Sequence, residues 1–281
     1  MDTHAPAAAA TNAEPPPVLL RLDDRGGGGI VAYVTVDNPR KLNTLNSRTM
    51  AALAETFDRL AADEKRLRAV VLSGAGDRAF IGGADIGEMA AIEEPGAARA
   101  FITLIHRTCD AMRRMPAPVI ARIQGYALGA GMEVAAACDL RIAAAGARFG
   151  MPEVRLGIPS VVEAALLPML IGWGRTRDLL LCGETIDAAE AARIGFVEEV
   201  APTAAALDEA VERRVAAIVA SGPRAIRAQK ALIRAWEDLP VDQAVQRGID
   251  AFAASWESDE PKRMMAEFLA ARRQRRRADR G

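Results

Sequence analysis

The sequence predicts an α/β fold followed by a C-terminal region made of helices. Short apolar segments typical of strands alternate with amphipathic helical segments through the first half of the chain. From about residue 162 the periodicity becomes mainly helical. A chain of 281 residues with 51% hydrophobic residues can also bury a substantial core.

The elements of the first half follow a leader that we expect to be disordered. Residues 1–17 are rich in Ala and Pro and have no periodicity, so they contribute nothing to the predicted core. Strands are predicted at Val18–Leu22, Ile30–Val36, Ala69–Leu72, Val119–Ile123 and Leu140–Ala143, with the turn Gly26–Gly29 between the first two. A helix begins at Ser47, and another spans about residues 97–114. This order is typical of β-α units on a parallel-rich sheet.

The later elements are mainly helices. They are predicted at Val162–Ile171, Arg175–Cys182, Ala188–Ile194, Thr203–Ser221, Pro223–Trp236, Val241–Ser255 and Pro261–Arg275. We therefore divide the chain into a core of residues 18–200 and a helical region of residues 201–281. Apolar faces on the last helices would close over the first half or pack against another subunit.

Charge and cysteine content exclude several classes of protein. Lys and Arg number 36 against 37 Asp and Glu, so no overall field favours nucleic acid or an anionic membrane. The three cysteines and two histidines lack the spacing of a disulfide framework or a metal site. No apolar run approaches the ~20 residues of a membrane span, and no export signal begins the chain. We expect a cytoplasmic protein without a metal.

The strongest functional signal is the segment Ile123–Glu133, which places a carboxylate at the end of what we expect to be an exposed glycine-rich turn. Gly129 and Gly131 let the backbone approach a ligand closely, and the run Val134–Cys138 predicts a helix after them. Unpaired N–H groups at a helix start would stabilise a developing oxyanion. Such a turn is also a common structural device, so it needs support from other motifs.

Four segments together resemble those of the enoyl-CoA hydratase/isomerase (crotonase) superfamily, in order and in spacing. They are Asn38–Leu45, Ala79–Ile86, the segment ending at Glu133, and Phe149–Pro159. These are similar to the family patterns P-K-x-L-N-A-L, F-x-x-G-A-D-[IL], G-x-x-x-G-[GA]-G-x-E and F-x-x-P-E-x-x-x-G-x-x-P. The likeness extends from about Val18 to Arg273. It implies a crotonase-like ββα spiral core, assembled as a homotrimer or homohexamer.

The resemblance further implies an acyl-CoA substrate whose thioester carbonyl lies between two backbone N–H donors. Residue by residue, these donors fall on Ala84 and Ala130, and Ala130 stands where a glycine is commoner. Chemistry next to a thioester builds an enolate, which two preorganised amide dipoles stabilise. Losing one such donor typically costs ~3 kcal/mol of barrier. Ala84 could instead be a small residue packed under a loop.

Glu133 and Glu153 match the two carboxylates with which hydratases of this family hold a water molecule. One would act as general base on the water and the other would supply a proton to the α-carbon, as two acids sharing a desolvated pocket allow. The alternatives are a helix-start carboxylate for Glu133 and a loop carboxylate paired with Arg155 or Arg141 for Glu153.

One segment departs from the family pattern. Where hydratases usually continue G-A-G-G-T after the proline, this chain has Ser160-Val161-Val162-Glu163-Ala164. We therefore expect an altered acyl pocket or water site. Ser160 could hydrogen-bond near the water, and Glu163 could be a third acid in the pocket or a helix-start carboxylate stabilised by the dipole.

The remaining residues implied by the resemblance would bind coenzyme A. Arg40 and Lys41 are the candidates for its phosphates, with a solvated surface pair as the alternative. The family uses the backbone of Leu42, Gly82, Asp85 and Ile86 around the pantetheine and adenine. No cofactor is implied beyond the coenzyme A that the substrate carries.

The function that the resemblance implies is syn hydration of a 2-enoyl-CoA to a 3-hydroxyacyl-CoA. Isomerisation, thioester hydrolysis or decarboxylation could proceed through the same enolate. A non-catalytic scaffold or RNA-binding protein is the alternative of a different class, with the basic segment Arg272–Arg280 as its working part. We expect that segment to be a frayed, solvated terminus and expect no nucleic-acid partner.

Overall fold

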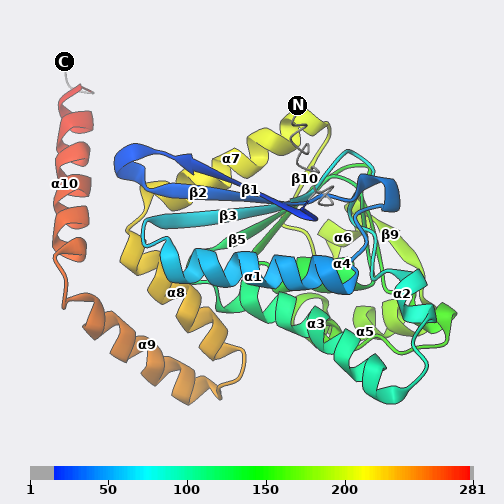
Figure 1. The fold of residues 1–281 in the computed structure, drawn as a ribbon. Helices are drawn as coiled ribbons and strands as arrows, with labels where there is room; N and C mark the ends of the chain where they lie inside the picture. Colours follow the sequence, from blue (N-terminus) through cyan, green and yellow to red (C-terminus); the bar gives the residue numbers. More distant parts are fainter. Residues whose placement is uncertain (1–15, 279–281) are drawn as a thin grey trace, which may run out of the picture.

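The computed structural model describes residues 16–278, whose larger sheet has six strands. They are β1 (Val18–Asp24), β2 (Ile30–Val36), β3 (Leu67–Gly74), β5 (Val119–Ile123), β7 (Leu140–Ala144) and β10 (Glu199–Ala201), in the order β1-β2-β3-β5-β7-β10. β1 pairs with β2 antiparallel, and the other pairs are parallel. The sheet runs through the middle of the molecule in Figure 1.

A second sheet consists of four strands of three residues each. They are β4 (Ala79–Ile81), β6 (Tyr126–Leu128), β8 (Arg148–Gly150) and β9 (Thr185–Asp187), in that order. The chain passes from β3 to β4, from β5 to β6 and from β7 to β8, and a helical segment follows each pair. This repeated ββα unit confirms the predicted spiral core. The short strands and β10 were not predicted, because three residues cannot display an alternating pattern.

Helices cover both faces of the larger sheet. On one side lie α1 (Ser47–Asp63) and α3 (Pro95–Arg114), which bury Phe57 and Met112 in the main core together with residues of α4 (Ala130–Ala137). On the other side α7 (Ala204–Ala220) packs Leu207 and Val211 against the strands in a second apolar cluster. Figure 1 shows the sheet between these layers.

The segment after β8 is less regular than the sequence suggested. It forms the 3₁₀ helices η3 (Glu153–Leu156) and η4 (Val162–Leu166), and then α5 (Leu167–Cys182). The predicted helix over residues 162–171 thus begins as a 3₁₀ helix. Gly172, at φ 75° and ψ 158°, interrupts α5 where two helices were predicted to meet. The short helices α2 (Ile86–Ala90) and α6 (Ala188–Arg193) complete the core.

The last helices are α8 (Pro223–Trp236), α9 (Val241–Ser255) and α10 (Glu260–Ala278), and Figure 1 shows α9 and α10 leading away from the sheets. β10 crosses the expected boundary between residues 200 and 201 and ties α7 to the core. The basic segment was predicted to be a frayed, solvated terminus. It is helical as far as Ala278, because α10 continues through it, and residues 272–275 are exposed as expected. Most of the predicted leader, residues 1–15, lies outside the described residues, as do residues 279–281.

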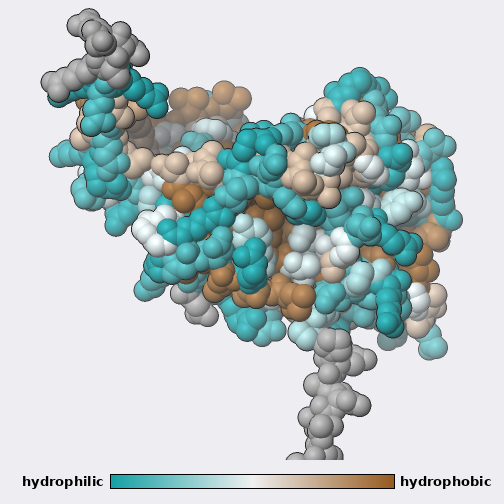
Figure 2. Space-filling model, turned by 90° about the horizontal axis from the view of Figure 1, so that it is seen from above, coloured by the Kyte–Doolittle hydropathy of each residue, from teal (hydrophilic) through white to brown (hydrophobic). Residues whose placement is uncertain are grey.

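Large apolar side chains remain exposed on the C-terminal helices. On α8 to α10 and the turns between them they are Ile233, Trp236, Val241, Val245, Ile249, Phe252, Trp256, Met265, Phe268 and Leu269. Figure 2 shows hydrophobic surface at the end of the molecule where Figure 1 places these helices. Among the described residues, no helix is both long enough and apolar enough to cross a membrane.

Candidate active site

The glycine-rich turn joins β6 to α4. Gly129 has φ 52°, and a Cβ there would clash with Oε1 of Glu153, so only glycine fits. α4 begins at Ala130, four residues earlier than predicted. The expectation of an exposed turn is wrong: Gly129, Ala130 and Gly131 are all buried, because neighbouring segments pack directly on them.

One of these neighbours is the end of β4, which leads into the segment that carries Ala84. A Cβ on Gly131 would clash with the carbonyl oxygen of Ile81, which brings the second and third sequence motifs into contact. Ala84 forms a parallel bridge with Leu45, in which the Leu45 N–H donates to Gly83 and the Asp85 N–H donates to Leu45. The residues on either side of Ala84 make these bonds, so its own N–H points away from Leu45.

Ala130 supplies a second N–H of this kind. As the first residue of α4, it has no intrahelical acceptor for its N–H, and the positive end of the helix dipole lies there. Ala84 and Ala130 are thus held on two packed segments with their main-chain donors outside the regular hydrogen bonding. This arrangement suits an anionic oxygen.

Glu133 lies in the first turn of α4 and is 3% exposed. Its Oε1 accepts a hydrogen bond from the Ala164 N–H at 3.2 Å. The pKa of Glu133 is raised to about 8, first by burial and then by the charge of Glu153, while the Ala164 N–H lowers it and the charge of Glu163 raises it. Glu133 therefore holds a proton at neutral pH, unlike an ordinary helix-start carboxylate.

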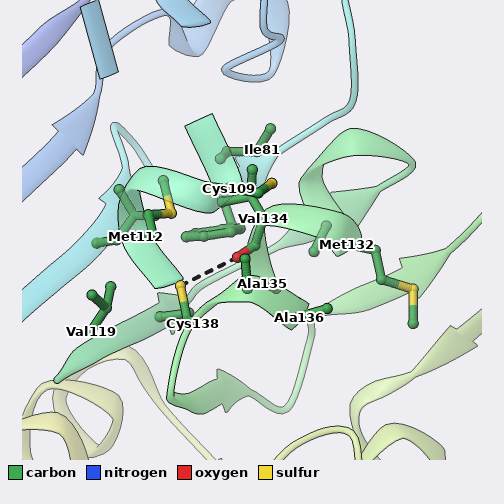
Figure 3. Packing of buried hydrophobic residues seen from close by; sticks show 14 of the residues in the cluster. Ile81, Cys109, Met112, Val119, Met132, Val134, Ala135, Ala136 and Cys138 are labelled. Atoms are coloured by element: carbon green, nitrogen blue, oxygen red, sulfur yellow. Dashed lines mark hydrogen bonds between the residues drawn. The ribbon is translucent and has the colours of Figure 1, made fainter. Parts of the chain in front are cut away.

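The apolar surroundings of Glu133 explain this desolvation. Figure 3 shows Cys109 and Met112 of α3 gathered in one buried cluster with Met132 and Val134 of α4. At the end of the helix, the Cys138 thiol donates to the Val134 carbonyl at 3.3 Å. In such a medium the neutral form of a carboxyl group is favoured.

Glu153 approaches from η3 on the other side of the turn. Ser160 Oγ donates to its Oε2 at 2.7 Å, while its Oε1 lies against Gly129. The predicted alternatives for Glu153 do not hold, because Arg141 pairs with Glu198 and Arg155 pairs with Glu184. The structure thus places Glu133, Glu153 and Ser160 together beside the glycine-rich turn.

Glu163 of η4 is a third acid near this pair. It is 6% exposed, and its Oε1 lies 2.9 Å from Nδ1 of His106 on α3. Glu163 lies in the first turn of η4, and its charge contributes to the raised pKa of Glu133. His106 was missed, since no local pattern links it to a residue 57 positions away.

The residues predicted to bind coenzyme A lie on the first two motifs. Lys41 Nζ pairs with Asp85 Oδ2 at 3.1 Å, and the Gly82 N–H donates to the Leu42 carbonyl at 2.8 Å. Asp85 also caps α2 by accepting from the Glu88 N–H, and the pKa of Asp85 is lowered by that bond first and by Lys41 next.

Of the residues predicted to bind coenzyme A, Arg40, Lys41 and Ile86 are exposed. Leu42 adopts φ 54°, a left-handed conformation rarely found for leucine, and Asn43 follows at φ 56°. Buried Asn43 holds this turn by donating to the carbonyls of Ala75 and Ala79. The turn with Arg40 and Lys41 is therefore fixed beside the segment that carries Ala84.

The repeated ββα units, with the glycine-rich turn at their centre, define a crotonase-fold protein. The family model for enoyl-CoA hydratase/isomerase matches residues 26–276, so the chain belongs to that family.

Named relatives cover most of the chain. A short-chain-enoyl-CoA hydratase of Clostridium acetobutylicum is 35% identical over 246 residues, which are 87% of this chain and 93% of that protein. An (E)-benzylidenesuccinyl-CoA hydratase of Thauera aromatica is 36% identical over 217 residues, 76% and 83% of the two chains. The crystal structure of an enoyl-CoA hydratase of Mycobacterium smegmatis superposes with a TM-score of 0.84 at 31% identity, covering 90% of this chain and 96% of that one.

Proposed function

We propose that this protein is an enoyl-CoA hydratase, a lyase that adds water syn across the C2=C3 bond of a 2-enoyl-CoA to give a 3-hydroxyacyl-CoA. The observation that carries the proposal is the pair of carboxyl groups beside the turn that begins α4, the buried Glu133 and the half-buried Glu153. Relatives named as enoyl-CoA hydratases support the same reaction.

The thioester oxygen would lie between the N–H groups of Ala84 and Ala130. When hydroxide adds to C3, negative charge moves onto this oxygen as an enolate forms. Both donors are fixed before the reaction, by the bridge to Leu45 and by the start of α4, so they stabilise the charge without reorganising.

The two glutamates would divide the proton transfers. Glu153, which accepts from Ser160, takes a proton from the water as its oxygen bonds to C3. Glu133, whose pKa of about 8 keeps it protonated at neutral pH, gives its proton to C2. Water thus contributes hydroxyl to C3, a proton reaches C2, and one proton remains on the pair. The reverse sequence dehydrates the product.

Coenzyme A would enter along the first two motifs. Arg40 and Lys41 are exposed on the turn beside Ala84 and offer cations to its phosphates. Leu42, Gly82, Asp85 and Ile86 provide backbone around the pantetheine and adenine. The substrate carries this group, so the reaction proposed here requires no metal and no further cofactor.

We also propose a homotrimer or homohexamer, supported by the apolar side chains exposed on α8 to α10. The cytoplasm remains the proposed compartment, in keeping with three unpaired cysteines at positions 109, 138 and 182.

The test is turnover of a panel of short, long, branched and aromatic 2-enoyl-CoAs, followed by loss of the conjugated-thioester absorbance and by product mass. Gain of one water on at least one substrate is the expected result. Release of free coenzyme A or carbon dioxide, or a shifted double bond, without gain of water would instead assign thioester hydrolysis, decarboxylation or isomerisation. No reaction with any substrate would favour the scaffold or RNA-binding alternative. Salt-sensitive binding of RNA that is lost when residues 272–281 are deleted would support that alternative.

A further inference from the structure

Glu163 is a buried acid that the proposed chemistry does not use. One oxygen, Oε1, is held by His106, whose side chain is 54% exposed. The other oxygen, Oε2, is buried and has no hydrogen-bond partner within residues 16–278. Leaving a buried acceptor unpaired costs free energy, so a carboxylate here is expensive for folding alone.

The main chain next to Glu163 is hydrogen-bonded to the Glu133 side chain. The residue after Glu163 is Ala164, and the Ala164 N–H donates to Glu133 Oε1. The residue before it, Val162, adopts φ 40°, a conformation that β-branched residues rarely tolerate. Strained backbone of this kind persists where the surroundings over-determine it, often beside functional sites. Here the strained residue Val162 directly precedes Glu163, whose carboxyl group is buried next to Glu133, the proposed proton donor.

The charged and titratable groups around Glu163 come from the helices α3 and α4 and from the 3₁₀ helix η3. They are His106, Cys109, Asp110 and Arg113 of α3, Glu133 of α4, and Glu153 beyond it. The pKa of Glu163 is raised overall, because burial raises it more than the hydrogen bond and charge of His106 lower it. Burial and the charges of Glu163 and Glu133 raise the pKa of Cys109, the thiol that Figure 3 shows beside α4, so that thiol stays neutral.

Among the described groups that act on Glu133, Glu163 is therefore the one carboxyl group outside the proposed catalytic pair. A surface His–Glu pair would have little influence on another residue, because solvent screens it. In this pair the glutamate end is buried, where charges interact more strongly than in water.

We infer that Glu163 is a positioning residue for Glu133. Held by His106, its carboxylate keeps a negative charge beside Glu133 that favours the protonated form, while the adjoining Ala164 N–H orients the Glu133 carboxyl group. The inference rests on the proposed hydratase function, in which Glu133 donates the proton to C2.

The variant that tests this inference is Glu163→Gln, which keeps size and hydrogen bonding to His106 but removes the charge. Without that charge Glu133 loses its proton at lower pH. The alkaline limb of kcat/KM for hydration should therefore move down by ~0.5–1 pH unit, with KM nearly unchanged. Asp208→Asn is the matched control, because it removes a carboxylate paired with Arg122 on the other side of the sheet and should leave the limb in place.

A second variant keeps the test decisive if Glu163→Gln folds poorly. His106→Phe removes the donor but keeps Glu163, which then holds its own proton to higher pH. The limb should lie between those of wild type and Glu163→Gln. A limb shift upward, or no shift in either folded variant, would overturn the inference, since loss of packing alone lowers kcat without moving the limb.

A measurement without turnover separates this inference from the proposed function. The infrared C=O stretch of a protonated carboxyl, assigned to Glu133 by its loss in Glu133→Gln, can be titrated in each variant. A downward shift in Glu163→Gln without hydratase activity on any thioester would retain the coupling and reject the function. Hydratase activity together with an unshifted titration of Glu133 would retain the proposed function and reject the coupling to Glu163.

Discussion

Glu133 combines two properties that ordinary folding disfavours, a carboxyl group in an apolar helix and a like-charged neighbour. Burial and Glu153 raise its pKa to about 8, close to the pH at which proton transfer is useful. Ser160 donates to Glu153, so the two acids sit in different surroundings although they share one pocket. This asymmetry is what the division of roles between them requires.

Replacing either acid should therefore abolish chemistry while sparing binding. We expect Glu133→Gln and Glu153→Gln each to lower kcat by ~10²–10⁴-fold with little change in KM, because the thioester contacts remain. Steady-state kinetics on the best substrate of the panel measures both constants. Glu209→Gln, at an exposed position on α7, is the control. Undiminished activity in either variant would reject the two-carboxylate mechanism.

The same burial predicts a pH-dependent stability cost. The folded pKa of Glu133 lies above its ordinary value of 4.5, so the stability linked to its protonated form is present below pH 4.5 and lost as pH rises through about 8. Glu133→Gln cannot ionise and should unfold at a higher temperature than wild type, by a margin that grows from pH 5 to pH 9. At the alkaline end the difference in the free energy of unfolding between the variant and wild type is on the order of a few kcal/mol. Thermal unfolding across this range checks it, and a constant difference would contradict it.

At this scale the sequence identified the residues whose spacing is local. Glu133 follows the glycine-rich turn on one helix, and Glu153 begins η3 just after β8, so short motifs were sufficient to place both. The contact between His106 and Glu163 depends on how α3 packs against η4 and on the strained turn at Val162. No pattern within either segment contains that information.

At the scale of elements, the contact between the β4 segment and α4 fixes the two main-chain donors. Gly131→Ala should be favourable for the helix by roughly 1 kcal/mol on propensity alone. The added Cβ would instead meet the Ile81 carbonyl, so we expect a net loss of ~1–3 kcal/mol and a fall in kcat as Ala84 and Ala130 separate. Denaturant unfolding and kinetics measure the two effects. Gly146→Ala, with no atom within 4 Å of its Cβ, should change neither.

α8 is attached to the core by a buried cation. Lys230 is 8% exposed and donates to the carbonyls of Met112 and Ala117 and to Asp139 Oδ2 at 2.7 Å. Lys230→Met would leave all three acceptors short of a donor, so we expect a loss of ~1–3 kcal/mol, measured by denaturant unfolding. Lys262→Met, at an exposed position on α10, is the matched control. Equal stabilities would mean that water replaces the ammonium at no cost.

Helices and strands were predictable where they were long enough to show a helical or an alternating pattern of apolar residues. The predictions for β2, with seven residues, and α3, with twenty, matched the structure closely. The three-residue strands of the second sheet were not predicted. β4 and β6 exist because they pair with each other beside the larger sheet, and residues 79–81 alone have no alternation to read. The site residues Ala84, Ala130 and Glu153 lie in the segments that follow these unpredicted strands, so their position was predicted from the motifs and not from secondary structure.

At the scale of the whole molecule, the C-terminal helices are incompletely buried. α9 exposes Val241, Val245, Ile249 and Phe252, which are 81%, 58%, 57% and 68% exposed and fall on one face at helical spacing. An apolar face of this kind is costly in water and typical of surfaces that contact another subunit. The spiral core supplies no further element to cover it within residues 16–278.

The proposed oligomer should therefore depend on this face. Light scattering during size-exclusion chromatography should give the wild-type protein the mass of three or six chains at micromolar concentration. Ile249→Asp places a charge in the apolar face and should shift the population toward single chains, because desolvating an unpaired carboxylate opposes association. Gln243→Asp adds the same residue to α9 at an exposed polar position on the opposite side and should leave the mass unchanged. A wild-type protein that elutes as a single chain over this range would reject the oligomer, and equal effects of the two variants would reject this face as its interface.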